Sequence, residues 1–278
     1  MKEWLLWYLA SLVLGWLAFP IAYRLLPALK DRGYSLSRVL GILIWGYSFW
    51  TLASLGMLPF DMGGLLFSAA LLAALSVWAA SGIPRSEFKE WLVSQGRLVA
   101  ASELLFLACF AGWAVVRAAN PEALGTEKPM ELAFINAILR SRTFPPHDPW
   151  LSGYAISYYY FGFVLVAMLA KLTATAGSIA FNLGVVLVFA LSAAGAYGIV
   201  YNLLNAWKRA GERSIARRPR SRKPPLRRLG YLISASAWSQ AYSKKSNRSA
   251  AGCGPVDYRV VRSESKRAAE PLLTGGVR

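Results

Sequence analysis

The sequence consists largely of long apolar stretches that contain almost no charged residues. Six such stretches lie near residues 4–23, 39–59, 62–83, 98–117, 155–173 and 178–204. Each is close to the roughly 20 residues that a helix needs to cross the hydrocarbon core of a membrane. Because lipid offers the backbone no hydrogen-bond partners, such segments are expected to be helical. The sequence therefore predicts an all-α, polytopic transmembrane protein with about six spanning helices.

The positive charge of the chain is concentrated in its last quarter. Residues 1–205 contain 13 Lys and Arg against 10 Asp and Glu, whereas residues 206–278 contain 18 against 4. We therefore divide the chain into a transmembrane domain, 1–207, and a basic, low-complexity tail, 208–278. The Arg-, Ser- and Pro-rich composition of the tail cannot bury enough apolar surface to fold, which predicts disorder.

Three interpretations of the tail remain open. It is a plain disordered tail, an arm that binds anionic lipid or nucleic acid, or the product of a reading-frame shift near residue 208 in the gene of a longer protein. Because no aromatic residues interleave with the Arg cluster, we expect no nucleic-acid partner. The oligomeric state is left open by the sequence.

Loop charges predict the orientation in the membrane. The segments 24–38 and 85–97 are basic, and the positive-inside rule places them in the cytoplasm. The N-terminus and the loop 118–154 then lie on the extracytoplasmic side of the cell membrane. Six crossings would also bring the basic tail to that side, which conflicts with the same rule.

The loop 118–154 contains a predicted amphipathic helix at 127–140. Its apolar residues recur at helical spacing, and we expect them to lie flat in the headgroup region of the outer leaflet. Thr126 can cap the helix, and Pro129 is early enough to be tolerated. The apolar positions are Met130, Ala133, Phe134, Ala137 and Ile138.

Glu127 and Glu131 lie one helical turn apart and can face the same side. Two such carboxylates can remove a proton from a hydroxyl group or help to hold a divalent metal. Alternatively, they only satisfy the N-terminus of the helix. Spacing alone favours this structural role.

The segment "RTFPPHDPWLSG" contains three prolines and is expected to be extended. It carries the single histidine, His147, and Asp148 back towards the membrane, where Asp148 can bind a metal or a hydroxyl group. Asp-Pro and Pro-Pro pairs are also common in simple turns.

Aromatic residues follow at the predicted start of the fifth helix. Tyr154 and Tyr158 can share one helix face, whereas Tyr159 and Tyr160 point elsewhere. They form an interfacial aromatic belt or a platform for a sugar ring or a lipid phosphate.

Glu103 is the one carboxylate inside a predicted span. Such a residue is a candidate functional group by default. Because Glu103 lies near the cytoplasmic end, its side chain can alternatively extend to the membrane surface.

The stretch "GTEKPMELAFINAILRSRTFPPHDPWLSGYAISYYYFG", followed by "AFNLGVVLVFAL", resembles the YYY-domain family of uncharacterised prokaryotic membrane proteins, named for its tyrosine triplet. The resemblance covers about residues 1–207. This family is in turn distantly similar to the C-type glycosyltransferases, polytopic enzymes that use polyprenyl-phosphate-linked sugars. The resemblance implies that the chain is the N-terminal part of a longer enzyme that transfers a sugar on the extracytoplasmic face.

The resemblance also implies roles for individual residues. The catalytic residues would be Glu127, Glu131 and Asp148, with Glu127 as the base and with Glu127 and Asp148 as ligands of Mg²⁺ or Mn²⁺. Membrane lipids and the polyprenyl-phosphate sugar would be the partners. The substrate would contact Arg140, Arg142, His147, Tyr154, Tyr158 and Tyr159. The alternative is a non-catalytic scaffold or transporter module. We expect the 278-residue chain alone to be inactive.

Overall fold

The computed structural model describes residues 2–151 and 153–216, which belong to one compact unit. Within these residues the regular secondary structure is helical, and the β-structure is a single bridge between His147 and Ala155. The predicted all-α polytopic fold is therefore confirmed. The helices are α1 (Lys2–Leu25), the short 3₁₀ helix η1 (Tyr34–Leu36), α2 (Ser37–Ser54), α3 (Met62–Ser81), α4 (Arg85–Ala119), α5 (Lys128–Arg140), α6 (Phe161–Leu172) and α7 (Gly177–Ala216).

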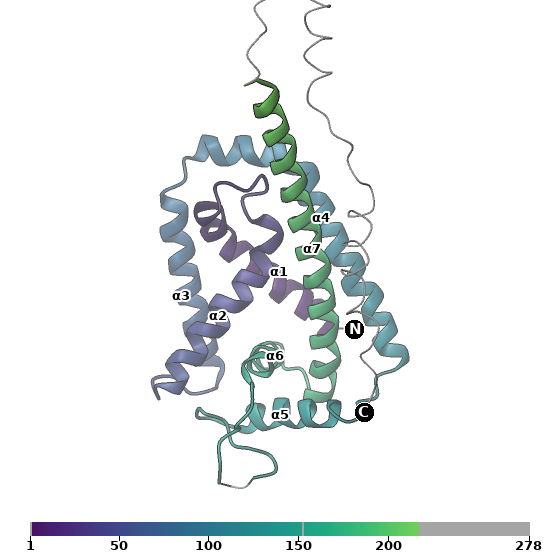
Figure 1. The fold of residues 1–278 in the computed structure, drawn as a ribbon. Helices are drawn as coiled ribbons and strands as arrows, with labels where there is room; N and C mark the ends of the chain where they lie inside the picture. Colours follow the sequence, from purple (N-terminus) through teal and green to yellow (C-terminus); the bar gives the residue numbers. More distant parts are fainter. Residues whose placement is uncertain (1, 152, 217–278) are drawn as a thin grey trace, which may run out of the picture. The chain divides into compact units, whose positions relative to one another are not determined.

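Five helices of the described chain, instead of the predicted six, are long and apolar enough to span a membrane. They are α1, α2 with the preceding η1, α3, α4 and α7. The predicted span 155–173 is reduced to α6, whose 12 residues extend about 18 Å. That is well short of the roughly 30 Å hydrocarbon core. Figure 1 shows α6 end-on, across the direction of α7.

The tyrosine triplet is not helical because the chain before α6 is held in an irregular loop. Ala155 pairs with His147, and the backbone N–H of Ile156 donates to the carbonyl of Pro146 at 3.0 Å. The expectation that Tyr154 and Tyr158 share a helix face is therefore wrong.

Two other predicted helices are longer than expected. The helix predicted at 98–117 begins at Arg85, and its first turns lie across one end of the bundle (Figure 1). Trp91, in these turns, packs against Phe19, Tyr23 and Tyr34. The helix predicted at 178–204 continues to Ala216. The tail predicted at 208–278 begins inside α7: residues 208–216 are helical, contrary to the expected disorder, and residues 217–278 lie outside the described residues.

We call one end of the bundle the basic end. There the end of α1 and the beginning of α4 lie close to α7. The guanidinium of Arg32 forms an ion pair with Glu87 at 3.1 Å. The backbone N–H of Lys30 donates to Oδ1 of Asn202 at 2.9 Å. The final turns of α7 therefore lie at the end of the bundle that carries the loop 26–33.

The opposite end, which we call the α5 end, contains α5, α6 and the beginning of α7. The Phe60 N–H, next to the start of α3, donates to the carbonyl of Arg142 at 2.8 Å. Asp61 caps α3 by accepting from the Gly64 N–H at 2.9 Å. The indole N–H of Trp7 on α1 donates to Thr175 at 3.2 Å. The five long helices consequently alternate in direction, and α7 runs from the α5 end to the basic end (Figure 1).

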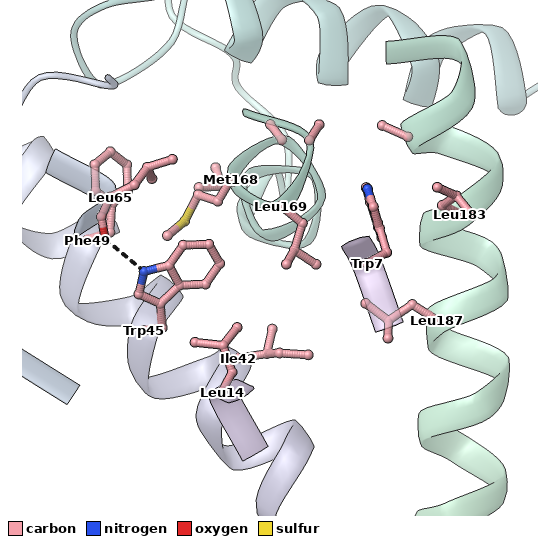
Figure 2. Close-up of a cluster of buried hydrophobic side chains, with 14 of the residues drawn as sticks. Trp7, Leu14, Ile42, Trp45, Phe49, Leu65, Met168, Leu169, Leu183 and Leu187 are labelled. Carbon is pink, nitrogen blue, oxygen red and sulfur yellow. Dashed lines mark hydrogen bonds between the residues drawn. The ribbon is translucent and has the colours of Figure 1, made fainter. Parts of the chain in front are cut away.

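The main hydrophobic core lies between α1, α2, α6 and α7 (Figure 2). Trp7 and Trp45 are fully buried there, and the Trp45 indole N–H donates to the carbonyl of Leu65 at 3.0 Å. Helices α1 and α2 approach closely at Gly41, where an added Cβ would overlap the Leu14 carbonyl. Small residues of this kind allow close helix packing inside a membrane.

Candidate functional site

Where an amphipathic helix is predicted at 127–140, the structure has α5, Lys128–Arg140, with Glu127 as its N-cap residue. The side chain of Glu127 makes no capping hydrogen bond, and its carbonyl accepts from the Glu131 N–H at 3.0 Å. Phe134 and Ile138 are buried in the main protein core. The apolar side of α5 therefore packs on protein. The expectation that it lies among lipid headgroups is wrong.

A pocket of about 510 Å³ opens beside the C-terminal half of α5. It contains four of the predicted site residues: Arg140, Arg142, His147 and Asp148. Its other lining residues are Ala133, Asn136, Ala137, Ser141, Thr143 and Pro149. We call it the α5 pocket. The extended segment after α5 folds back, so that Arg142 and Thr143 before its turn and His147 and Asp148 after it all line the α5 pocket.

The α5 pocket has an excess of positive charge. Among the described residues, no carboxylate lies within the 4.0 Å ion-pair distance of Arg140 or Arg142. Both guanidinium groups therefore keep their charge available for an anion. Arginine binds phosphate and carboxylate groups well because its donors form a planar fork.

Lys171, at the end of α6, adds a third positive charge close to Arg142. Its Nζ lies 4.3 Å from the ring centroid of Phe60. Burial lowers the pKa of Lys171, and Arg142 lowers it further, while Asp61 opposes the shift. Sequence reasoning missed Lys171 because it was placed inside a predicted membrane span, far from Arg142 in the sequence.

Asp148 is held in a fixed orientation at the pocket. Its Oδ1 accepts from the backbone N–H groups of Trp150 at 2.8 Å and Leu151 at 2.9 Å. Its own N–H donates to the carbonyl of Tyr154 at 2.9 Å. This arrangement closes the turn after Pro149, so Asp148 has a structural role in addition to any chemical one.

Glu127 and Glu131 lie outside the α5 pocket. Neither lines it, and about 14 Å of helix separate Glu127 from Asn136. Their charges instead act on Tyr158, whose pKa is raised first by a hydrogen bond with Tyr159, then by burial and these charges. The structure thus does not bring Glu127 and Asp148 to one pocket.

Tyr158 and Tyr159 form a separate aromatic surface near the N-terminal half of α5. The rings of Tyr158 and Tyr159 lie 4.2 Å apart, and Tyr158 also packs 5.7 Å from Phe134. Tyr159 is 82% exposed and Tyr154 is 70% exposed. The tyrosines predicted to bind substrate are thus accessible, but they do not line the α5 pocket.

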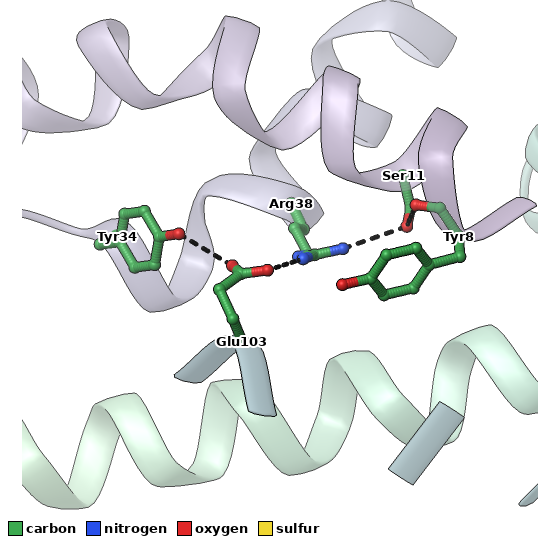
Figure 3. A network of polar contacts seen from close by, with 5 residues as sticks. All are labelled: Tyr8, Ser11, Tyr34, Arg38 and Glu103. Carbon is green, nitrogen blue, oxygen red and sulfur yellow. Dashed lines mark hydrogen bonds and ion pairs between the residues drawn. The ribbon is translucent and has the colours of Figure 1, made fainter. Parts of the chain in front are cut away.

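A polar network lies inside the spanning region, away from the α5 pocket (Figure 3). The carboxylate of Glu103 forms an ion pair with Arg38 and accepts from the Tyr34 hydroxyl at 2.8 Å. Arg38 also donates to Ser11 at 3.3 Å and lies over the ring of Phe106. Glu103 is thus paired inside the protein, and the network links α1, α2 and α4.

Comparison with known proteins identifies the family and leaves the activity open. Neither a curated protein nor a solved structure shows significant similarity to this chain. A family model described as an uncharacterised membrane protein, DUF2298, matches residues 44–242. The match contains the α5 pocket, all the predicted site residues and most of α2 through α7. The chain therefore belongs to the DUF2298 family of membrane proteins.

Proposed function

We propose that this chain provides the donor site of a membrane glycosyltransferase that takes a sugar from a polyprenyl-phosphate carrier. The observation that carries the proposal is the α5 pocket, where Arg140 and Arg142 share one cavity with Asp148. The two unpaired guanidinium groups suit the phosphate of the donor. The pocket volume of about 510 Å³ falls in the range of small-molecule sites.

The proposed reaction assigns separate tasks to these groups. The acceptor hydroxyl attacks the anomeric carbon of the sugar as the bond from that carbon to the phosphate oxygen breaks. The bonding electrons leave with the phosphate, whose added charge Arg140 and Arg142 stabilise. Asp148 takes the proton of the attacking hydroxyl group. Glu127, the base implied by the family resemblance, lies outside the pocket and would act on a second substrate portion beside Tyr158.

The donor set of the pocket does not suit Mg²⁺ or Mn²⁺. One or two carboxylates together with substrate phosphate oxygens commonly hold Mg²⁺, but the single carboxylate of this pocket lies among two guanidinium groups whose charge repels a cation. The described residues also contain no cluster of three or more His, Cys, Asp or Glu side chains that could hold a metal. No step of the proposed reaction therefore depends on a metal.

Charge distribution supports an extracytoplasmic location for the α5 pocket. The basic end carries an excess of positive charge, whereas at the α5 end Asp61, Glu122, Glu127, Glu131 and Asp148 balance the basic residues Arg117, Lys128, Arg140, Arg142 and Lys171. The positive-inside rule then places the basic end in the cytoplasm of the cell and the α5 end outside. Donors presented in the outer leaflet would reach the pocket from the membrane surface.

The proposal predicts that Asp148→Asn lowers sugar transfer at least 100-fold, the usual contribution of a general base. Because we expect the 278-residue chain alone to be inactive, the assay uses a full-length version of the enzyme that contains this site and follows transfer of labelled sugar from a synthetic polyprenyl-phosphate donor in membranes. Arg142→Gln should weaken donor binding, measured separately with the immobilised polyprenyl-phosphate sugar. Glu122→Gln, an exposed carboxylate outside the pocket, is the matched control.

Glu127→Gln separates the two candidate bases in the same assay. Loss of sugar transfer in Glu127→Gln but not in Asp148→Asn would show that Glu127 is the base, as the family resemblance implies. Unchanged transfer in both variants, with normal membrane insertion, would exclude a catalytic role for either carboxylate.

A non-catalytic scaffold or transporter module is the second candidate. The observation in its favour is the turn that Asp148 closes with Trp150 and Leu151. In that case Asp148→Asn would lower thermal stability, and neither the variant nor the parent protein would bind the donor.

A further inference from the structure

A second cavity lies between the beginnings of α1 and α7 and the end of α4, apart from the α5 pocket. Its volume is about 1070 Å³, and most of its wall is apolar. We call it the α4–α7 groove. On α4 the wall is formed by one helix face, with Ala111, Ala114, Val115 and Ala118 at helical spacing. Small side chains on this face leave the space open.

The depth of the groove corresponds to one leaflet of a membrane. From Ala111 to Ala118 the wall extends about 10 Å along α4, and from Ser178 to Val186 about 12 Å along α7. Half of a roughly 30 Å hydrocarbon core is about 15 Å. The groove therefore reaches from the α5 end of the bundle towards the membrane centre but not across it.

Positive charge is fixed at the mouth of the groove. The Nε of Arg117 donates to Oδ1 of Asn182 at 2.9 Å, and a second guanidinium nitrogen contacts the same oxygen. Asn182 in turn donates to the carbonyl of Pro121 at 3.2 Å. Because these partners are neutral, Arg117 keeps its full charge in a fixed position. Lys2 and Glu3 also line this mouth.

We propose that the α4–α7 groove binds one anionic phospholipid of the leaflet at the α5 end. An acyl chain would lie along the apolar wall, and the headgroup phosphate would contact Arg117. The apolar wall excludes a free phosphate ion as the main ligand, since an isolated ion would leave the groove unfilled. This inference goes beyond the proposed transferase activity and does not depend on it.

The test measures lipid retained by the whole protein after reconstitution in equimolar phosphatidylglycerol and phosphatidylcholine. After mild delipidation, native mass spectrometry should show one phosphatidylglycerol retained per chain. Ala114→Trp, which fills the groove, should abolish retention. Ala70→Trp, an exposed alanine on α3 outside the groove, is the matched control and should retain the lipid.

Arg117→Gln tests the headgroup contact without filling the groove. It should lower the preference for phosphatidylglycerol over phosphatidylcholine about fivefold, as expected for one basic side chain near a lipid phosphate. Equal retention in Ala114→Trp and Ala70→Trp would overturn the proposal. So would the lack of any anionic preference in the parent protein, or displacement of the lipid by inorganic phosphate alone.

Discussion

At the scale of single residues, the ion pair between Arg38 and Glu103 is an interaction inside the spanning region whose loss would cost much free energy. Arg38 is 6% exposed and pairs with Glu103 on another helix. A charged group in a membrane protein that loses its partner is expensive to keep buried. The sequence identifies Glu103 as an unusual carboxylate within a predicted span. It does not identify Arg38 as the partner of Glu103, because the two residues lie 65 positions apart and local sequence patterns do not show which helices pack together.

Glu103→Gln is expected to destabilise the protein by about 2 kcal/mol, because Arg38 loses a charged hydrogen-bond partner. Arg38→Met should have a similar cost. In the double variant the loss should be smaller than the sum of the two, since neither charge is then left unpaired. Thermal unfolding in detergent micelles, followed by circular dichroism, measures all three.

The control for this cycle is Glu90→Gln, an exposed carboxylate on the same helix. It should change stability little, as surface charges usually do. If the stability loss of the double variant equals the sum of the two single losses, Arg38 and Glu103 do not stabilise each other.

The candidate site illustrates what residue patterns could predict. Arg140, Arg142, His147 and Asp148 were selected from one loop, and the structure places them in one pocket. Proximity in the sequence was enough here, because a short extended segment returns along the end of α5. Glu127, which the resemblance grouped with Asp148, does not line this pocket, because it lies at the other end of α5 from Arg140. Lys171 was missed because only tertiary packing brings α6 beside this loop.

At the scale of helices, α1 and α2 pack backbone to backbone where they cross. Gly41 lies against the Leu14 backbone, and a Cβ at Gly41 would lie 2.6 Å from the Leu14 carbonyl carbon. Backbone atoms cannot move aside as a flexible side chain can. The sequence alone does not predict this role of Gly41, since the role depends on which helix packs against it.

Gly41→Ala is therefore expected to force the two helices apart and destabilise the protein by about 3 kcal/mol, the upper range for overpacking. Gly112→Ala is the matched control, since no heavy atom lies within 4 Å of the added Cβ on α4. It should stabilise the helix by up to about 1 kcal/mol. Resistance to unfolding in a detergent titration measures both, and equal effects would contradict the proposed crossing.

Helix boundaries were predictable where apolar composition and breakers agreed, as for α1 and α3. The predicted start of α4 was wrong. Charged residues suggested a loop before it, but Trp91 packs the first turns of α4 against the aromatic cluster around Phe19. The predicted boundaries were also wrong at α6, where an apolar tyrosine-rich segment suggested a longer helix. Hydropathy does not distinguish a spanning helix from a short buried one when both are apolar.

At the scale of the whole molecule, the number of crossings decides which side each segment faces. Six crossings place the residues after α7 on the side opposite the basic loops, in conflict with the positive-inside rule. Five crossings place the end of α7 with those loops, and the conflict disappears. The structure supports five because α6 is short and lies across the bundle (Figure 1).

The proposed transferase site depends on this topology, since the proposal requires the α5 pocket at the extracytoplasmic end of the bundle. Labelling of single cysteines in intact cells with a membrane-impermeant thiol reagent tests it most directly. The native Cys109 and Cys253 are first replaced by serine. Single cysteines are then introduced as Thr143→Cys beside the α5 pocket, Ala176→Cys before α7 and Lys208→Cys towards its end.

Five crossings predict that the first two positions are labelled and that position 208 is protected until the cells are permeabilised. Labelling at 143 and 208 with protection at 176 would show that α6 crosses the membrane. Protection at 143 with labelling at 208 would reverse the orientation and place the α5 pocket in the cytoplasm. Either result would contradict the account.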